Sequence, residues 1–271
     1  MRLAHISDTH FGTEEAPVCA ALERDILAAA PDLVVLTGDV TQRARAAQFR
    51  AARAFLDRLG PIPRLVVPGN HDLPLFDLPA RFLSPYHHYR RYIDPDLAPL
   101  WQGPEVAVVG VNSTRVLRHK HGALPPELVR MVAARLGELP QPFKVVALHH
   151  PLAVVEASDL GNLARGGAAA LAAWAEAGAD LFLGGHIHLP YCIPAGPPAR
   201  PALVLQAGTA VSRRRRGGQP NSYNLVHFQD GANRRIGIEQ RYYEAGLERF
   251  VARIVRQARN AGRGWDLYSE G

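Results

Sequence analysis

A short apolar run followed at once by oxygen or imidazole side chains occurs five times along the chain. The clearest case is Leu65-Val66-Val67-Pro68, which leads directly into Gly69-Asn70-His71-Asp72. A short β-branched run bounded by Pro and Gly is typical of a buried strand, so the polar residues should lie on the loop beyond its C-terminal end. Open α/β sheets carry their chemistry at that edge. The repeated pattern therefore favours an α/β fold with one composite site.

The first three apolar runs alternate with helical patterns. Runs 2–7, 33–36 and 65–67 are separated by segments 17–30 and 44–59, where apolar residues recur at helical spacing. A βαβαβ order with right-handed crossovers places three parallel strands side by side, with their C-terminal loops at one edge of the sheet.

The later chain continues the pattern and then changes. Strands are predicted over 106–111, 145–148 and 181–183, and helices over 125–139 and 164–177. Residues 74–102 lack a clear period and are interpreted as an excursion over the site that contains short helices. After residue 188 the runs 203–206, 223–228 and 235–242 have no helices between them, which predicts antiparallel edge strands of a second sheet.

The C-terminal segment has an apolar stripe with arginines beside it. Leu247, Phe250, Ile254 and Ala258 lie at helical spacing. The pattern predicts a main domain over 1–245 and a basic amphipathic helix and tail over 246–271. Such a helix docks on its own domain or on a subunit of a homo-oligomer, and the alternative is a membrane surface.

Composition narrows the partners without choosing among them. The 271 residues carry a formal charge of +6, which favours phosphate esters, nucleic acid or anionic lipid. A general preference of the chain for arginine explains the positive charge equally well, because lysine occurs only at Lys120 and Lys144. Two cysteines give no disulfide framework, and no leader or long apolar span is recognisable. A cytoplasmic location, with or without peripheral membrane contact, is expected.

The residues that follow the strands form a metal-binding set. In chain order they are Asp8, His10, Asp39, Asn70, His71, His149, His186 and His188. These are too many ligands for one ion and suit two. Nitrogen and oxygen donors without a thiolate favour divalent Mn, Fe, Zn or Co. One carboxylate must be shared, and Asp39 is the expected bridge because it comes from the central position.

Each motif alone has an ordinary explanation. Asn70 and its glycine could form a solvated turn, Gly38-Asp39 could be another turn, and a single histidine such as His149 is often an interfacial residue with satisfied hydrogen bonds. The five motifs in order, each after its strand, favour a dinuclear metal site over these explanations.

The motifs D-x-H, G-D, G-N-H-D, a strand-end H and G-H-x-H, from Asp8 to His188, resemble those of the calcineurin-like metallophosphoesterase superfamily. The resemblance implies a four-layer α/β/β/α sandwich of two mixed sheets flanked by helices. It also implies one metal held by Asp8, His10, Asp39 and His188, and another held by Asp39, Asn70, His149 and His186. His149 is chosen over His150 because the ligand aligns with the first position of His-Ser-Pro motifs. The looser resemblance within the superfamily is to bacterial cyclic-nucleotide phosphodiesterases.

The expected chemistry is hydrolysis of a phosphodiester by in-line attack of a metal-bridging hydroxide. His71 is not needed as a ligand, so we expect it to assist the leaving group, with Asp72 positioning it. Arg213, Arg214, Arg215 and Arg216 lie between glycines and are candidates for binding a second anionic group, against the alternative of a solvated loop.

Three other functions remain open from the sequence. They are a UDP-linked or lipid-linked diphosphate hydrolase at an anionic membrane surface, a nuclease, and a metal-free scaffold of the same fold. Nucleic acid is not required as a partner, the chain after residue 188 is short for the capping domain of related nucleases, and the complete ligand set argues against the scaffold.

Overall fold

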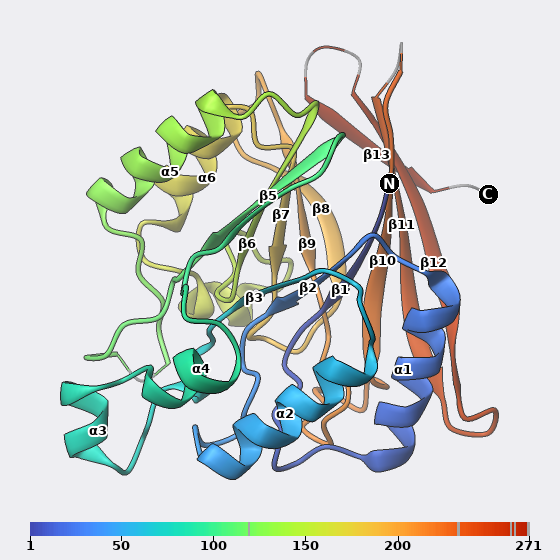
Figure 1. Ribbon diagram of the computed structural model, residues 1–271. Coiled ribbons are helices and arrows are strands. Elements are labelled where there is room, and N and C mark those ends of the chain that lie inside the picture. Colours follow the sequence, from blue (N-terminus) through green and yellow to red (C-terminus); the bar gives the residue numbers. More distant parts are fainter. Residues whose placement is uncertain (119, 232–233, 261, 263, 270–271) are drawn as a thin grey trace.

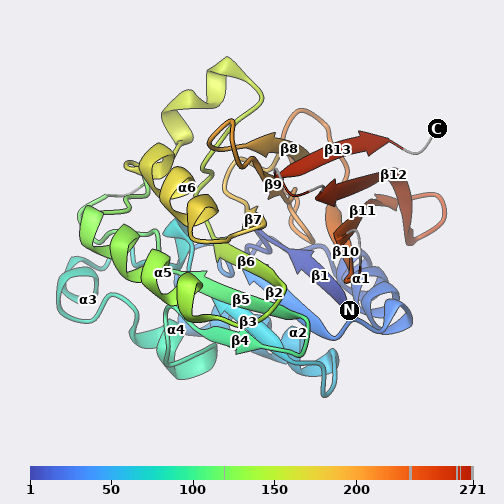
Figure 2. The ribbon, with the colours of Figure 1, turned by 90° about the horizontal axis from the view of Figure 1, so that it is seen from above.

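The computed structural model describes residues 1–118, 120–231, 234–260, 262 and 264–269. Two β-sheets lie face to face, and helices cover their outer faces (Figures 1 and 2). Among the described residues, no helix has the length and apolar character needed to cross a membrane.

The first sheet has seven strands in the order β13-β12-β11-β10-β1-β2-β3. The strands β1, β2 and β3 are parallel neighbours, and β10 to β13 extend the sheet in antiparallel fashion beyond β1. Their bounds are β1 Arg2–Ile6, β2 Leu33–Thr37, β3 Arg64–Val67, β10 Ser222–Gln229, β11 Arg234–Glu244, β12 Arg249–Asn260 and β13 Trp265–Ser269. The predicted parallel βαβαβ unit is confirmed.

The second sheet has six strands in the order β4-β5-β6-β7-β9-β8, with antiparallel strands only at its two edges. Their bounds are β4 Leu100–Gln102, β5 Val106–Val111, β6 Phe143–Leu148, β7 Leu181–Gly184, β8 Tyr191–Ala195 and β9 Ala202–Gln206. The central strands are continuous apolar runs because both faces of this sheet are buried.

Helices pack on the two outer faces. Their bounds are α1 Ala16–Ala29, α2 Ala46–Arg58, α3 Leu78–Leu83, α4 His87–Tyr92, α5 Pro126–Glu138 and α6 Gly167–Glu176. The buried faces of α1 and α2 pack on the first sheet, and those of α5 and α6 pack on the second (Figure 2). A third apolar cluster fills the space between the sheets, with Leu3, Val35, Val145 and Leu183 among its members. The predicted four-layer sandwich is therefore confirmed.

The two sheets are joined at the edge where β1, β2, β6 and β7 end. Within the first sheet the backbone N–H of Asp8 donates to Gly38 O (3.1 Å), and within the second sheet that of Gly185 donates to His149 O (3.0 Å). Nδ1 of His149, from the second sheet, is 2.8 Å from Thr37 O in the first. These contacts bring strand ends from both sheets to one place.

The helix predicted over 246–271 is wrong. Residues Arg249–Asn260 form β12, which pairs with β11 along its whole length, and Trp265–Ser269 form β13. The apolar stripe was consistent with a helix, but its β-branched residues also suit a strand, and β11 offers an edge whose N–H and C=O groups need partners. Residues 261, 263 and 270–271 of that prediction lie outside the described residues.

The second sheet was also predicted incorrectly after residue 200. The strand β9 does join it, but runs parallel to β7. The strands β10 and β11 belong to the first sheet, where β10 pairs with β1. A strand's pattern of apolar residues shows that it is buried but does not show which of two facing sheets it joins.

Replacing Trp265 by alanine tests the structural role of the C-terminal strands. The indole is 1% exposed, packs 6.2 Å from the Phe143 ring and donates from Nε1 to the buried Asp180 carboxylate at 3.0 Å. We expect Trp265→Ala to lower the free energy of unfolding by about 3–5 kcal/mol in urea titrations. Tyr268→Ala, at a 40% exposed position of the same strand, is the control. Equal small losses in both variants would contradict the packing described.

Candidate metal centre

The side chains predicted as ligands converge from both sheets. Asp8 and His10 follow β1, Asp39 follows β2, and Asn70 begins the short 3-10 helix Asn70–Asp72 after β3. From the second sheet, His149 follows β6, and His186 and His188 follow β7. The carboxylates and the imidazoles of His10 and His149 are almost completely buried.

One group of donor atoms surrounds Oδ1 of Asp8. Nε2 of His188 lies 3.1 Å from this oxygen, and Nε2 of His10 lies 3.7 Å from it. The two imidazole nitrogens are 3.1 Å apart, and Oδ2 of Asp39 is 3.6 Å from His10 Nε2. Donors bound at about 2.1 Å to one ion lie about 3.0–3.5 Å apart, so the spacing fits a metal.

A second group surrounds Oδ1 of Asn70. Nε2 of His149 is 3.2 Å from this amide oxygen, and Nδ1 of His186 is 3.0 Å from it. Oδ1 of Asp39 lies 3.4 Å from His149 Nε2. Asp39 thus turns one carboxylate oxygen toward each group, which is the arrangement needed for a bridge between two ions.

The Asp8 carboxylate has one oxygen placed to receive a cation. Its Oδ2 accepts hydrogen bonds from Ser7 Oγ (2.6 Å) and from the backbone N–H of His186 (3.0 Å). Its Oδ1 is buried and has no hydrogen bond among the described residues, because the nearby His188 Nε2 (3.1 Å) carries a lone pair while the ring's single proton is on Nδ1. A buried oxygen without a donor is costly, and a cation at this point would satisfy it.

The backbone is strained at the same residues. Five of the eight described non-glycine residues with positive φ are predicted ligands, namely Asp8, His10, Asp39, His186 and His188. L-residues rarely adopt this conformation, and such outliers concentrate at functional sites. The neighbouring glycines are required by space: a Cβ on Gly69 would collide with the backbone and carboxylate of Asp39, and one on Gly185 with Ser7 and Asp8.

Hydrogen bonds to carbonyl oxygens orient two of the imidazoles. Nδ1 of His149 donates to Thr37 O at 2.8 Å, and Nδ1 of His188 donates to Arg214 O at 2.6 Å. With the proton held on Nδ1, the Nε2 lone pair faces the donor group, as metal-binding histidines require.

The histidines of the cluster differ in the direction in which their surroundings shift the pKa. Burial opposes charge throughout the cluster, but the Asp39 carboxylate raises the pKa of His149 to about 9, and Asp8 raises the pKa of His188. Burial lowers the pKa of His10 and of His186 to about 3. The two carboxylates therefore favour the protonated form of His149 and His188, and a metal that binds must displace any such proton.

His150 is close to this cluster but its ring nitrogens are engaged elsewhere. One of its ring nitrogens lies within 4.8 Å of ring nitrogens of His149 and His186, so by distance alone the three could share a metal ion. However, Nδ1 lies 2.8 Å from Ser113 Oγ, and Nε2 lies 3.1 Å from Lys120 O. A neutral imidazole has one donor and one acceptor nitrogen, and these two contacts use both. The geometry therefore favours His149 as the ligand.

The two residues predicted to be catalytic have different surroundings. His71 lines the pocket beside the cluster, with Nδ1 3.1 Å from Gln42 O and Nε2 3.1 Å from Arg214 Nη1. Asp72 is buried and accepts hydrogen bonds from the backbone N–H groups of Gly69 and Thr41. Asp72 therefore ties the two ligand loops together, and its predicted positioning of His71 stays a prediction.

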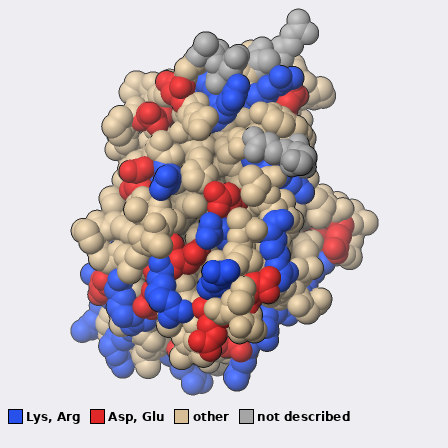
Figure 3. Space-filling view, turned by 90° about the vertical axis from the view of Figure 1, so that its right-hand side faces the viewer, with Lys and Arg blue, Asp and Glu red and all other residues tan. Residues whose placement is uncertain are grey.

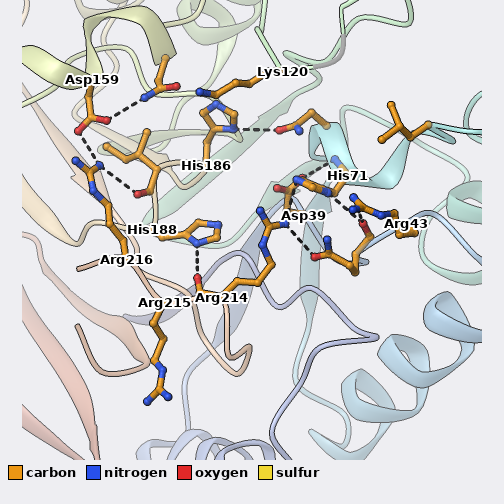
Figure 4. Close-up of a pocket in the computed structure, with 15 residues that line it drawn as sticks. Asp39, Arg43, His71, Lys120, Asp159, His186, His188, Arg214, Arg215 and Arg216 are labelled. Atoms are coloured by element: carbon orange, nitrogen blue, oxygen red, sulfur yellow. Dashed lines mark hydrogen bonds and ion pairs between the residues drawn. The ribbon is translucent and has the colours of Figure 1, made fainter. Parts of the chain in front are cut away.

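The pocket, about 650 Å³ in volume, opens over the cluster and is lined by several cations. Of the four consecutive arginines, Arg214, Arg215 and Arg216 line it, whereas Arg213 is exposed and is not among the lining residues. Arg216 is neutralised by ion pairs to Asp159 (2.7 Å) and Glu156 (2.6 Å). Figure 4 shows Arg214 reaching toward His71 and Asp39, while Arg215 extends away from them.

Gln42 is a lining residue that sequence reasoning missed. It lies three residues after Asp39, on the same loop, and contacts both His71 and Arg214. Its place in a ligand loop was the only available signal, because an isolated glutamine has no characteristic motif.

Comparisons with known proteins agree with this geometry. A sequence model of the family described as calcineurin-like phosphoesterase matches residues 1–190. Glycerophosphodiester phosphodiesterase GpdQ of Enterobacter lignolyticus is 31% identical over 169 residues, which cover 56% of this chain and 57% of that protein. A probable cyclic nucleotide phosphodiesterase of Synechococcus sp. is 26% identical over 162 residues, covering 56% of this chain and 58% of that one.

The fold likeness extends further than the sequence likeness. A dimetal phosphatase from Danio rerio matches with a TM-score of 0.64 at 13% identity, covering 89% of this chain and 96% of that chain. By contrast, the match to the two curated relatives spans less than two thirds of their length.

Exchanging the two adjacent histidines for glutamine tests the choice of ligand. We expect His149→Gln to bind one Mn²⁺ or Zn²⁺ per chain in place of two, because it removes a donor facing Asn70 and Asp39. His150→Gln is the matched control and should retain two. Metal content after gel filtration, measured by inductively coupled plasma mass spectrometry, decides between them. The reverse result would assign the ligand to His150.

Proposed function

The chain belongs to the calcineurin-like phosphoesterase family, and on that premise we propose that it is a phosphodiesterase that uses two divalent metal ions. Asp8, His10, Asp39 and His188 would hold one ion, and Asp39, Asn70, His149 and His186 the other. The observation that carries the proposal is that Asp39 turns Oδ1 to one donor group and Oδ2 to the other, beneath an open pocket.

Two ions bound there would polarise the phosphoryl oxygens and supply hydroxide as a nucleophile at neutral pH. The chain's own residues attract and orient the ester. Lys120, Arg214 and Arg215 line the pocket and favour an anion over a neutral substrate. His71 lies at the side of the pocket where it can assist the leaving group.

A phosphodiester of small or moderate size is the proposed substrate class. The relatives' names point to glycerophosphodiesters or cyclic nucleotides, both of which have an alcohol leaving group. Because Arg216 is already paired with two acidic residues, we confine substrate contact in this loop to Arg214 and Arg215 and leave Arg213 out.

The alternative of a lipid-linked substrate at a membrane was based on the predicted basic C-terminal helix and on the arginine loop 213–216. The helix no longer supports it, because Arg249–Asn260 form β12. On β12, Arg253 pairs with Glu244 of the neighbouring β11, and Figure 3 shows basic and acidic side chains interspersed on this side of the molecule. Manganese or iron as the native metal, a cytoplasmic location, an anionic lipid surface and a homo-oligomer stay predictions.

Metal removal tests the proposed function. We expect the chelated protein to be inactive toward bis(p-nitrophenyl) phosphate, glycerophosphoethanolamine and cyclic AMP, with Mn²⁺ or Co²⁺ restoring turnover of at least one diester at least 10²-fold. A phosphomonoester, UDP-diacylglucosamine and single-stranded DNA complete the panel. Full turnover by protein shown to be metal-free would rule out the mechanism, and a preference for UDP-diacylglucosamine or DNA would select an alternative function.

His71→Ala tests assistance to the leaving group. We expect unchanged metal content and a loss in kcat of roughly 10²- to 10⁴-fold for an alkyl diester, because a poor leaving group needs stabilisation as it departs. The loss should be much smaller for bis(p-nitrophenyl) phosphate, whose leaving group departs unaided. Equal losses on both substrates would contradict the proposed role.

A further inference from the structure

Arg214 is held at the site by its main chain. Its carbonyl oxygen accepts the Nδ1 proton of His188 at 2.6 Å, and its backbone N–H donates to Ser212 Oγ at 3.1 Å. A proposed metal ligand and the arginine loop therefore fix each other, so the arginine side chain starts from a defined point beside the donor groups.

The guanidinium is held at one end. Its Nη1 donates to Gln42 Oε1 at 2.9 Å and contacts His71 Nε2 at 3.1 Å. An arginine nitrogen can only donate, so His71 Nε2 must be the acceptor, and the imidazole proton lies on Nδ1, which donates to Gln42 O. In this arrangement His71 holds the Arg214 guanidinium in place beside the pocket. Its own proton, on Nδ1, is directed to Gln42 O and away from the pocket.

The other edge of the guanidinium has no acceptor. In the part of the chain that the structure describes, no hydrogen bond or ion pair involves Nε or Nη2 of Arg214, and the half-buried side chain lines the pocket. These two N–H groups form the planar fork that spans two oxygens of one phosphate.

The neighbouring arginines lack this arrangement. Arg216 forms ion pairs with Asp159 and Glu156, and Nη2 of Arg215 lies 4.0 Å from Oε2 of Glu15. Arg213 is exposed. Of these four consecutive arginines, as the structure describes them, Arg214 alone has one guanidinium nitrogen held by neighbours and an Nε/Nη2 edge without an acceptor.

We propose that Arg214 grips the phosphoryl group on its leaving side, and that Gln42 and His71 are positioning residues that hold its Nη1. The Nε and Nη2 edge would span the departing oxygen and one non-bridging oxygen. Hydroxide forms a new bond to phosphorus as the P–O bond to the leaving group breaks, and the electron pair of that bond stays on the departing oxygen; the guanidinium stabilises this charge by hydrogen bonds, and water supplies the proton that makes the alcohol. This inference rests on the proposed phosphodiesterase function and makes the assistance of His71 indirect.

The first test uses metal-free protein and needs no activity. Long-range ¹H–¹⁵N spectra of histidine side chains distinguish the two imidazole tautomers. We expect wild-type His71 to carry its proton on Nδ1, with the Nε2 resonance displaced in Arg214→Gln and unchanged in Arg213→Gln. A proton on His71 Nε2 in the wild type would overturn the contact on which the proposal depends.

The second test measures affinity for inorganic phosphate by titration calorimetry of the manganese-loaded protein. Arg214→Gln should weaken phosphate binding at least 10-fold, and Arg213→Gln, which removes the same charge from the adjacent position, should leave it within 2-fold. Equal affinities in the two variants would overturn the proposal. This result is independent of turnover, so it stands even where the wild type hydrolyses none of the diesters and the proposed function itself fails.

A double-mutant cycle on an alkyl diester tests the division of roles. Loss of a transition-state donor costs roughly 10²- to 10³-fold in kcat, which we expect for Arg214→Gln at unchanged metal content. If His71 acts through Arg214, adding His71→Ala to Arg214→Gln should cost less than about 3-fold more. Full multiplication of the two losses would show that His71 acts independently and would overturn its assignment as a positioning residue.

Discussion

The site depends on a single buried carboxylate that serves two donor groups. Asp39 is 1% exposed, with Oδ1 beside His149 and Oδ2 beside His10. Because these imidazoles come from different sheets, the carboxylate can reach both only where the edges of the two sheets meet. The sandwich therefore does more than bury apolar surface: it sets the distance between the two halves of the centre.

Burying this charge has consequences for the whole neighbourhood. Without metal, the Asp8 and Asp39 carboxylates raise the pKa values of His188 and His149 and so favour the protonated form of these imidazoles. The loops hold several residues at positive φ, a conformation that persists only where surrounding contacts over-determine it. The four hydrogen bonds that Asp72 accepts from Gly69, Val40 and Thr41 provide part of that constraint. Metal binding would satisfy buried lone pairs such as that of Asp8 Oδ1 and balance the carboxylate charge, which couples the folded state to the loaded state.

A second group of polar residues lies outside the donor cluster and connects it to the pocket. Gln42 belongs to the loop that supplies Asp39, His71 to the loop that supplies Asn70, and Arg214 to the loop whose carbonyl orients His188. Each of these pocket-lining residues is thus one or a few positions from a predicted ligand, or bonded to one. Small shifts of the loops that carry the predicted ligands would therefore move these pocket residues as well.

The sequence by itself determined the parallel unit β1, β2 and β3 and the candidate ligand set, because these follow from local chemistry: apolar runs make strands, and the polar residues after them must lie at the strand ends. Only the tertiary structure decided the course of Arg249–Asn260, since those residues suit a helix or a strand equally until β11 provides an edge. It also decided which of His149 and His150 turns a ring nitrogen toward the other predicted ligands, and which of four consecutive arginines reaches His71. Those outcomes depend on partners far away along the chain, such as Thr37 for His149 and Gln42 for Arg214, and no local pattern records them.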